Sequence, residues 1–239
     1  MRIWQGLEMF EVPQPGGFIY PVLLYDEQGL MLVDTGYPKQ EDLLISIIQD
    51  AGFKLENLSH ILLTHHDFDH IGALRSLREK FPNIEVMAYE AEIPYIDGSV
   101  DALKIQDMER NINHLPENKK AFLVRMKSFF PLLTTKVDFP LHDNDVLDIA
   151  GGVEVIFTPG HTLGHICLYH RLSKTLIAGD ALNLDNGLLV GPNLDYTHDM
   201  QSASASIKHL EDFDIERIIT YHGGLFTHNV NESIKKLTR

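Results

Sequence analysis

Short apolar runs that end in aspartate or histidine recur along this chain. Residues 30–33 lead into Asp34, and residues 61–63 lead into a polar cluster that begins at His65. Similar runs occupy residues 152–157, 166–170, 175–178 and 218–221. Runs of this length between turn residues predict buried strands. Because a strand end fixes a side chain while the following loop leaves room for a ligand, we expect functional residues at these ends.

Segments with helical spacing separate several of the predicted strands. Apolar residues fall at helical intervals in residues 42–51, 74–81 and 200–212. Strand and helix therefore alternate, which predicts an α/β fold. The runs 16–25 and 30–33 flank a turn at 26–29 and predict a hairpin. Because no linker divides the chain, we expect one domain over residues 1–239, in which residues 91–140 form a helical insertion.

The composition limits the kinds of partner that the chain can bind. Of 239 residues, 44% are hydrophobic, which is typical of a globular chain. The 20 Lys and Arg residues against 34 Asp and Glu give a net charge of −14, so nucleic acid is not an expected partner. No apolar run approaches the length of a membrane span, and the single Cys167 cannot form an internal disulfide. We expect a cytoplasmic protein that acts on a small molecule, without a nucleic-acid or membrane partner.

Residues 65–70 form the densest group of titratable side chains in the sequence. Three histidines and two aspartates occupy these positions immediately after a predicted strand. Burial of these side chains together would cost free energy, and a bound cation would stabilise them. Alternate side chains of an extended segment share a face, so His65, Asp67 and Asp69 can converge, with His70 joining where a helix begins. Imidazole and carboxylate are ligands for zinc, manganese or iron, and the lack of clustered cysteines excludes a thiolate site.

Three further ligand-type residues follow predicted strands. His161 lies in the turn Thr-Pro-Gly-His, Asp180 ends the sequence Ile-Ala-Gly-Asp, and His222 precedes two glycines. With Asp34 in Val-Asp-Thr-Gly, the order and spacing of these motifs resemble those of the metallo-β-lactamase fold superfamily of metal-dependent hydrolases, over nearly the whole chain. The resemblance implies a four-layer αββα sandwich with two metals at one edge of the paired sheets. In its compact length, the chain resembles members of the lactonase and hydrolase branch of that superfamily.

The resemblance also implies a role for each matched residue. It would place His65, Asp67 and His161 on the first metal, and Asp69, His70 and His222 on the second, with Asp180 bridging them. Asp34 would orient ligands without binding metal itself, and His165 would be structural or would support a ligand.

Position 67 departs from the pattern of the family. The usual cluster is His-x-His-x-Asp-His, and this chain has Asp67 in place of the second histidine. The extra carboxylate leaves the site near neutral instead of with one excess positive charge, which favours iron or manganese more than a histidine would. Two alternatives stay open: His66 supplies the ligand through a local shift, or the first position is weak and the enzyme works with one metal. We expect two divalent ions, zinc first, with iron or manganese as alternatives.

The expected chemistry is hydrolysis. Two neighbouring metal ions hold a hydroxide at neutral pH and polarise a carbonyl, so we expect attack on a small ester, lactone or thioester. Asp69 is the expected proton shuttle, and Asp180 is the second catalytic carboxylate. Tyr196 either orients the substrate carbonyl or only packs. The residues expected to line an acyl pocket along the insertion are Met108, Phe122, Met126, Phe129 and Phe130.

Two other classes of function stay open. Asp67 allows a non-haem diiron oxidoreductase that acts on dioxygen or nitric oxide with an electron-transfer partner. A binding or sensor protein with a structural metal is disfavoured, because such sites are usually closed by four ligands and this one has seven candidates. A homodimer is suggested by the superfamily alone. The histidines without a companion motif are expected at the surface: His114, His142, His170, His198, His209 and His228.

Overall fold

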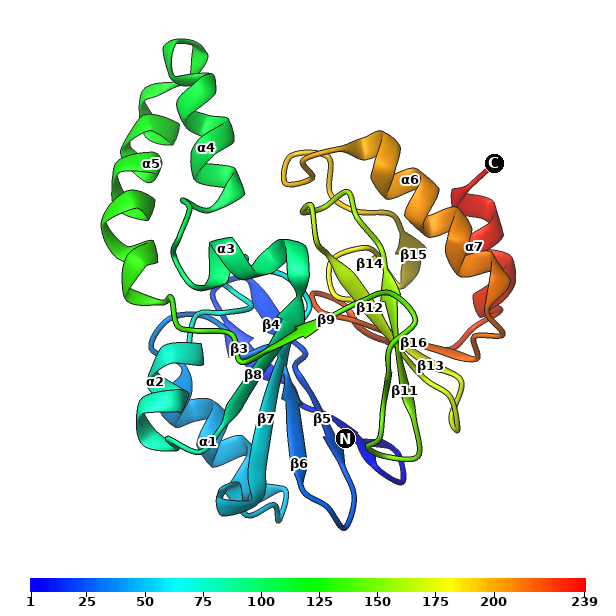
Figure 1. Cartoon of the computed structure of the whole chain (residues 1–239). Helices are drawn as coiled ribbons and strands as arrows, with labels where there is room; N and C mark the ends of the chain where they lie inside the picture. The colour runs from blue at the N-terminus through cyan, green and yellow to red at the C-terminus, as the bar shows by residue number, and fades with distance from the viewer.

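Two β-sheets face each other at the centre of the computed structural model, which describes residues 1–239 (Figure 1). The seven-stranded sheet contains, in spatial order, β1 (Arg2–Trp4), β2 (Leu7–Met9), β5 (Val22–Tyr25), β6 (Leu30–Val33), β7 (Leu58–Leu63), β8 (Glu85–Tyr89) and β9 (Phe139–Leu141). The six-stranded sheet contains β10 (Val146–Leu147), β11 (Val153–Phe157), β12 (Ile166–His170), β13 (Thr175–Ile177), β16 (Arg217–Thr220) and β17 (Gly224–Phe226). Two separate hairpins are β3 (Val12–Gln14) with β4 (Gly17–Ile19), and β14 (Asn183–Asp185) with β15 (Leu188–Val190).

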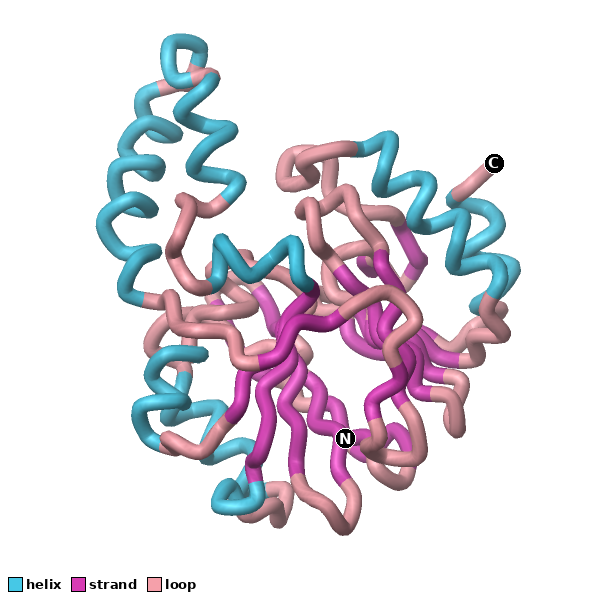
Figure 2. Tube along the Cα trace, in the orientation of Figure 1, coloured by secondary structure: helices cyan, strands magenta, loops and turns pink.

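Helices cover the outer face of each sheet. On one side lie α1 (Glu41–Asp50) and α2 (Leu74–Lys80), and on the other lie α6 (Met200–His209) and α7 (Val230–Leu237) (Figures 1 and 2). The predicted four-layer αββα sandwich is therefore confirmed. None of the helices is both long enough and apolar enough to cross a lipid bilayer.

The central strands are apolar on both faces because each face is buried. In β6, Leu32 packs toward α1 and α2, while Met31 and Val33 pack between the two sheets. In β7, Leu62 packs between the sheets, and Leu63 packs under the helices. Side chains of a strand alternate between its faces, so a strand buried on both sides reads as a continuous apolar run.

The strands that precede the polar motifs end at the same edge of the sandwich. Strands β6, β7 and β8 are parallel neighbours, so their carboxyl ends lie side by side. In the facing sheet, β13 and β16 are also parallel, and their carboxyl ends lead to Asp180 and His222. Parallel pairing thus gathers loops that are far apart in the sequence, which is where sites form in layered α/β folds.

The helical segment stands above this edge. It contains α3 (Ile93–Ile96), α4 (Leu103–Arg110) and α5 (Glu117–Phe129), and α4 and α5 form an antiparallel pair that projects from the sandwich (Figures 1 and 2). Helices occupy most of residues 91–140, where a helical insertion was expected, but not the end of that range. Residues 139–141 form β9, which pairs in parallel with β8 as the edge strand of the larger sheet.

Two other local expectations are corrected by the structure. Residues 16–25 do not form one strand, because Pro21 separates β4, which pairs with β3, from β5, which pairs with β6. His170, expected at the surface, is fully buried in β12. Its ring contacts the Ser173 hydroxyl at 2.6 Å and the Ala150 carbonyl oxygen at 2.7 Å, so both ring nitrogens have partners without solvent.

Candidate metal centre

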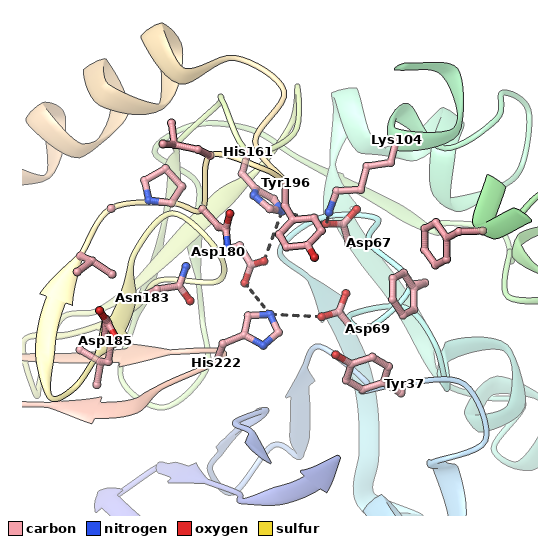
Figure 3. A pocket seen from close by; sticks show the side chains of 18 residues that line it. Tyr37, Asp67, Asp69, Lys104, His161, Asp180, Asn183, Asp185, Tyr196 and His222 are labelled. Carbon is pink, nitrogen blue, oxygen red and sulfur yellow. Dashed lines mark hydrogen bonds and ion pairs between the residues drawn. The ribbon is translucent and has the colours of Figure 1, made fainter. Parts of the chain in front are cut away.

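Seven histidine and aspartate side chains from both sheets meet at the edge where the strands end. Four follow β7, one follows β11, one follows β13 and one follows β16: His65, Asp67, Asp69, His70, His161, Asp180 and His222. They form two groups in each of which the candidate ligand atoms lie within 4.8 Å of one another. The structure therefore brings together all the residues that the sequence proposes as ligands, and Figure 3 shows five of them around one cavity.

The first group contains His65, Asp67, His161 and Asp180. Asp67 Oδ2 lies 2.9 Å from His161 Nε2 and 3.3 Å from His65 Nε2. The side chains are almost completely buried. Two imidazoles and two carboxylates at this separation can chelate a divalent ion.

The second group contains Asp69, His70 and His222. His222 Nε2 lies 3.3 Å from Asp69 Oδ2, and His70 Nε2 lies 4.0 Å from the same oxygen. Burial by itself lowers the pKa of His222, but the negative charge of Asp180 outweighs it and raises this pKa to about 10. The second group therefore attracts positive charge.

Asp180 lies between the two groups. Its Oδ1 is 3.3 Å from His222 Nε2 and 3.5 Å from His70 Nε2, while its Oδ2 is 3.4 Å from His161 Nε2. Burial alone would raise the pKa of Asp180, yet the facing histidines, His222 foremost, hold it well below its usual range. A carboxylate with one oxygen toward each group is suited to bridge two cations.

Several buried atoms of the site have no hydrogen-bond partner. Three of them, His65 Nε2, His70 Nε2 and Asp180 Oδ1, point into the two groups, and the fourth is His161 Nδ1. A buried polar atom without a partner costs free energy, so native proteins rarely leave three together without a ligand. The donor set and these unpartnered atoms fit divalent metal ions.

Asp34 fixes the orientation of the second group from behind. It follows β6 in a left-handed conformation with φ of 61°, which is uncommon for a residue with a side chain. Its Oδ1 accepts a hydrogen bond from Thr64 N at 2.9 Å, and its Oδ2 accepts one from the Thr64 hydroxyl at 2.8 Å. The same Oδ2 lies 2.9 Å from His70 Nδ1, so His70 donates through Nδ1 and presents Nε2 to the cluster.

His165 supports the backbone of Asp180 in a comparable way. His165 Nε2 accepts a hydrogen bond from Asp180 N at 3.0 Å, and its Nδ1 therefore donates to the Thr158 hydroxyl at 2.9 Å. Burial lowers the pKa of His165 to about 3, and the neighbouring His161 adds to this effect. A neutral ring with this tautomer holds the backbone of Asp180 in place.

His66 points away from both groups. Its ring is fully buried, pairs through Nδ1 with Glu92 and stacks on Tyr95 at a centroid distance of 4.3 Å. Its Nε2 accepts a hydrogen bond from Leu103 N at 3.1 Å. Both ring nitrogens are occupied, so the structure brings Asp67 and not His66 into the first group.

Lys104 is a part of the site that the sequence analysis did not single out. It lies at the second position of α4, and its ammonium group donates to Asp67 Oδ2 (Figure 3). Burial by itself lowers the pKa of Lys104, but the carboxylate of Asp67 raises it above the ordinary value, so the group is charged. No sequence motif marks this lysine, because it lies 37 residues from Asp67.

Other residues missed from the sequence connect the loops of the site. The Tyr221 hydroxyl donates to the Asp69 carbonyl oxygen at 2.7 Å and accepts from Gly36 N at 3.1 Å. Glu92 is fully buried, and its Oε1 accepts hydrogen bonds from the Thr162 hydroxyl and Gly164 N, both at 2.7 Å. The position of Tyr221 beside His222 is the one sequence signal that could have indicated either residue.

Two adjoining cavities open beside the site. The larger, of about 750 Å³, is bounded by Tyr37, Asp69, Asp180, Tyr196 and His222, among others. The smaller, of about 350 Å³, lies along α4 and α5, and its apolar lining residues include Met108, Phe122 and Met126.

Only some of the residues expected to form an acyl pocket line a cavity in the structure. Tyr196, which is half exposed, lines both cavities, and Met126 lines the smaller one. Phe129 lines neither: it packs edge-on against Phe68 at a centroid distance of 6.2 Å. Phe130 is buried in the core under the larger sheet. Phe129 is on the same face of α5 as Phe122 and Met126 but at the end of the helix, where it meets Phe68 and the core, and Phe130 lies just beyond the helix.

Comparison with known proteins identifies the family. A family model described as the metallo-β-lactamase superfamily matches residues 15–222. The chain belongs to the metallo-β-lactamase superfamily. The matched residues include every candidate ligand described above. The fold and the His/Asp groups of a metallo-β-lactamase superfamily member imply binding of divalent metal, and some relatives of the chain are named probable metallo-hydrolases.

Individual members of the superfamily are similar at moderate identity. The probable metallo-hydrolase YflN of Bacillus subtilis is 28% identical over 223 residues, which cover 86% of this chain and 80% of that protein. A hydroxyacylglutathione hydrolase of Rhizobium meliloti is 29% identical over 164 residues, which cover 68% of this chain and 47% of that protein. The chain thus matches only about half the length of that enzyme.

Solved structures show the same fold. The metallo-β-lactamase family protein TTHA1429 of Thermus thermophilus superposes with a TM-score of 0.76 at 24% identity, covering 99% of this chain and 79% of that one. A metallo-β-lactamase of Pontibacter korlensis gives a TM-score of 0.67 at 16% identity, covering 100% of this chain and 97% of that one.

Proposed function

We propose that this protein is a dinuclear metal-dependent hydrolase that acts on a small ester, lactone or thioester, with zinc as its metal. The observation that carries the proposal is the convergence of three unpartnered buried atoms, His65 Nε2, His70 Nε2 and Asp180 Oδ1, beside an open cavity. A closed structural site would leave no such opening toward substrate.

The residues of the two groups have separate tasks in this proposal. His65, Asp67 and His161 would hold one ion, Asp69, His70 and His222 the other, and Asp180 would contact both. Bound divalent ions would supply a nucleophile from water at neutral pH and polarise the substrate carbonyl. Asp69, whose side chain is mostly buried but reaches the larger cavity, is placed to carry a proton to the leaving group.

The shape of the cavities supports a small substrate with an apolar part. The smaller cavity has a mostly apolar surface, to which α4 and α5 contribute Met108, Phe122 and Met126, and His161 also lines it. The larger cavity is more polar and contains the acidic side chains. An acyl group seated along α4 and α5 would place its carbonyl near the metal ligands. The thioester option is supported by the likeness to hydroxyacylglutathione hydrolases.

The test begins with elemental analysis of protein purified without added metal, followed by assays with ester, lactone and thioester substrates. We expect two zinc ions per chain and turnover of at least one substrate class. In the Asp180→Asn variant, activity should fall by more than about 100-fold and the metal content should drop, because the loss of an inner ligand exceeds the cost of losing an outer partner. Asp50→Asn, at the exposed end of α1, is the matched control.

Two results would contradict the proposal. Full activity and metal content in Asp180→Asn would contradict the role of Asp180 as a ligand that contacts both ions. Two irons per chain, together with oxygen consumption in the presence of a reductase and no hydrolysis, would favour an oxidoreductase instead.

A further inference from the structure

Lys104 approaches the candidate metal centre from the helical segment and not from the sandwich. Its ammonium group forms an ion pair with Asp67 Oδ2, the oxygen that also lies against His65 and His161. The ring of Tyr196 lies 5.2 Å from the same ammonium group (Figure 3). The lysine therefore adds a positive charge to the group that would hold the first ion.

The backbone beside Lys104 is tied to the residue beside Asp67. Leu103 N donates a hydrogen bond to His66 Nε2 at 3.1 Å, at the point where α4 begins. His66 is held in turn by Glu92, which accepts hydrogen bonds from His66 N at 2.9 Å and from the loop that carries His161. Because these links are buried, they direct Lys104 toward Asp67 and make the ion pair a feature of the fold.

The charge of Lys104 offsets the charge that Asp67 adds. With two divalent ions, a carboxylate at position 67 lowers the net charge of the site by one relative to a neutral histidine. Lys104 restores that charge, so the Asp67 and Lys104 pair carries the same net charge as a histidine. The near-neutral site expected from the sequence alone is therefore corrected once Lys104 is counted.

We propose that Lys104 is a positioning residue that acts through Asp67, so that the two side chains together replace a neutral histidine at the first metal position and set the affinity of that position for zinc. This inference rests on the proposed function, because it requires that the site binds a divalent ion. It assigns a role in the site to a residue of the helical segment, outside the strand-end motifs.

The test measures the dissociation constant of Zn²⁺ for metal-free protein by competition with a chromophoric chelator. Lys104→Met should bind zinc more tightly than the unaltered protein by about tenfold or more, since a unit positive charge is removed close to a divalent ion. Asp67→His should bind zinc more weakly by a similar factor, because it leaves Lys104 unpaired beside the ion. The Asp67→His/Lys104→Met double variant should return to within about threefold of the unaltered protein, since its net charge is the same.

Two further variants separate this effect from general charge or folding. Lys104→Arg keeps the positive charge and should leave zinc affinity within about threefold. Lys119→Met removes a lysine that also lies over the Tyr196 ring, at 6.0 Å, but forms no ion pair with a candidate ligand, so zinc affinity should not change. Thermal unfolding of each metal-free variant shows whether it is folded.

The outcomes distinguish this inference from the proposed function. Unchanged or weaker zinc binding in Lys104→Met, or an equal shift in Lys119→Met, would overturn the role of Lys104 while leaving the metal site standing. Absence of zinc binding by the unaltered protein would overturn both. Opposite shifts in the two single variants that cancel in the double variant would support the inference, and a purely structural lysine would not produce them.

Discussion

His170 is a buried histidine whose two ring nitrogens are satisfied by the protein itself. Burial lowers its pKa below the ordinary value, and the hydrogen bond to the Ala150 carbonyl oxygen only partly opposes this. In the folded chain it therefore stays neutral at a pH where the unfolded chain takes up a proton. Its contribution to stability is complete above about pH 6.5, the ordinary histidine pKa, and is lost as the pH falls toward the lower folded value.

The pH dependence of this contribution to stability gives a prediction for His170→Gln. At pH 8 the variant should have a smaller free energy of unfolding than the unaltered protein, because the hydrogen bonds to Ser173 and Ala150 are weakened. At pH 5 the difference should shrink, since the variant has no imidazole to protonate. Urea unfolding of both proteins in the presence of a metal chelator, at the two pH values, measures this difference in the free energy of unfolding. The other titrating groups are the same in both proteins, so their effects cancel in the comparison. A constant difference would show that His170 does not titrate on unfolding.

At the scale of elements, the polar loop after β7 packs tightly against the loop after β6. A Cβ added at Gly72 would lie 2.3 Å from Pro38 N and 2.4 Å from the Tyr37 carbonyl carbon. Both contacts are with backbone, which cannot move aside as a side chain can. The loop that carries the ligands is thus held by direct contact between main chains, and Gly72 N also donates to the Gly36 carbonyl oxygen at 2.9 Å.

The Gly72→Ala variant should therefore lose about 1–3 kcal/mol of stability, the usual cost of overpacking. It should also bind less metal. Gly191→Ala is the matched control, because its added Cβ would meet only the flexible end of Ile207 at 3.5 Å. Urea unfolding and metal analysis of both variants make the comparison. Equal stability of the two variants would mean that the two loops are less tightly coupled than their contact suggests.

The α4 and α5 pair sets the apolar part of the proposed substrate site. Phe122 on α5 lines both cavities. In Phe122→Ala, KM should rise by about tenfold for a substrate with a long acyl chain, because about two methylene groups lose their apolar contact. An acetyl substrate should be unaffected, and Val124→Ala, on an exposed part of the same helix, is the control. An equal rise in KM for both substrates would place the acyl group elsewhere.

At the scale of the whole molecule, the two sheets meet at an edge rich in negative charge. Asp67, Asp69 and Asp180 converge there in a chain whose net charge is already −14. Without cations, the negative charges of Asp67 and Asp180 are stabilised by the neighbouring histidines and by Lys104. Since the site draws residues from both sheets, binding of ions there links the two halves of the sandwich.

Removal of metal should therefore lower the thermal unfolding midpoint of the whole protein. A ligand that binds only the folded state at 1,000 times its dissociation constant adds about 4 kcal/mol of stability, which corresponds to several degrees for a domain of this size. The midpoint should rise with zinc concentration in metal-free protein and not in Asp180→Asn. A midpoint that does not depend on zinc would show that the site contributes nothing to stability.

The sequence by itself determined the layered α/β fold and the set of candidate metal ligands. Buried strands read as apolar runs, and five motifs that follow such strands contain every residue that the structure brings into the two groups. These features could be predicted because they are local: strand periodicity, turn residues and the crowding of residues 65–70 are all visible within a few positions. Parallel neighbours then place the strand ends at one edge, whatever the details of packing.

Tertiary structure decided which side chains turn toward the site. Asp67 and His66 are neighbours in sequence and both were candidate ligands, and the contacts of His66 with Glu92 and Leu103 show that it is Asp67 that joins the first group. Lys104 reaches Asp67 because the neighbouring Leu103 is hydrogen-bonded to His66. The burial of His170 and the packing of Phe129 on the core likewise depend on elements distant in the chain. Periodicity gives the face of a strand or helix, but the direction of a side chain in a loop is set by contacts that form only when the chain is folded.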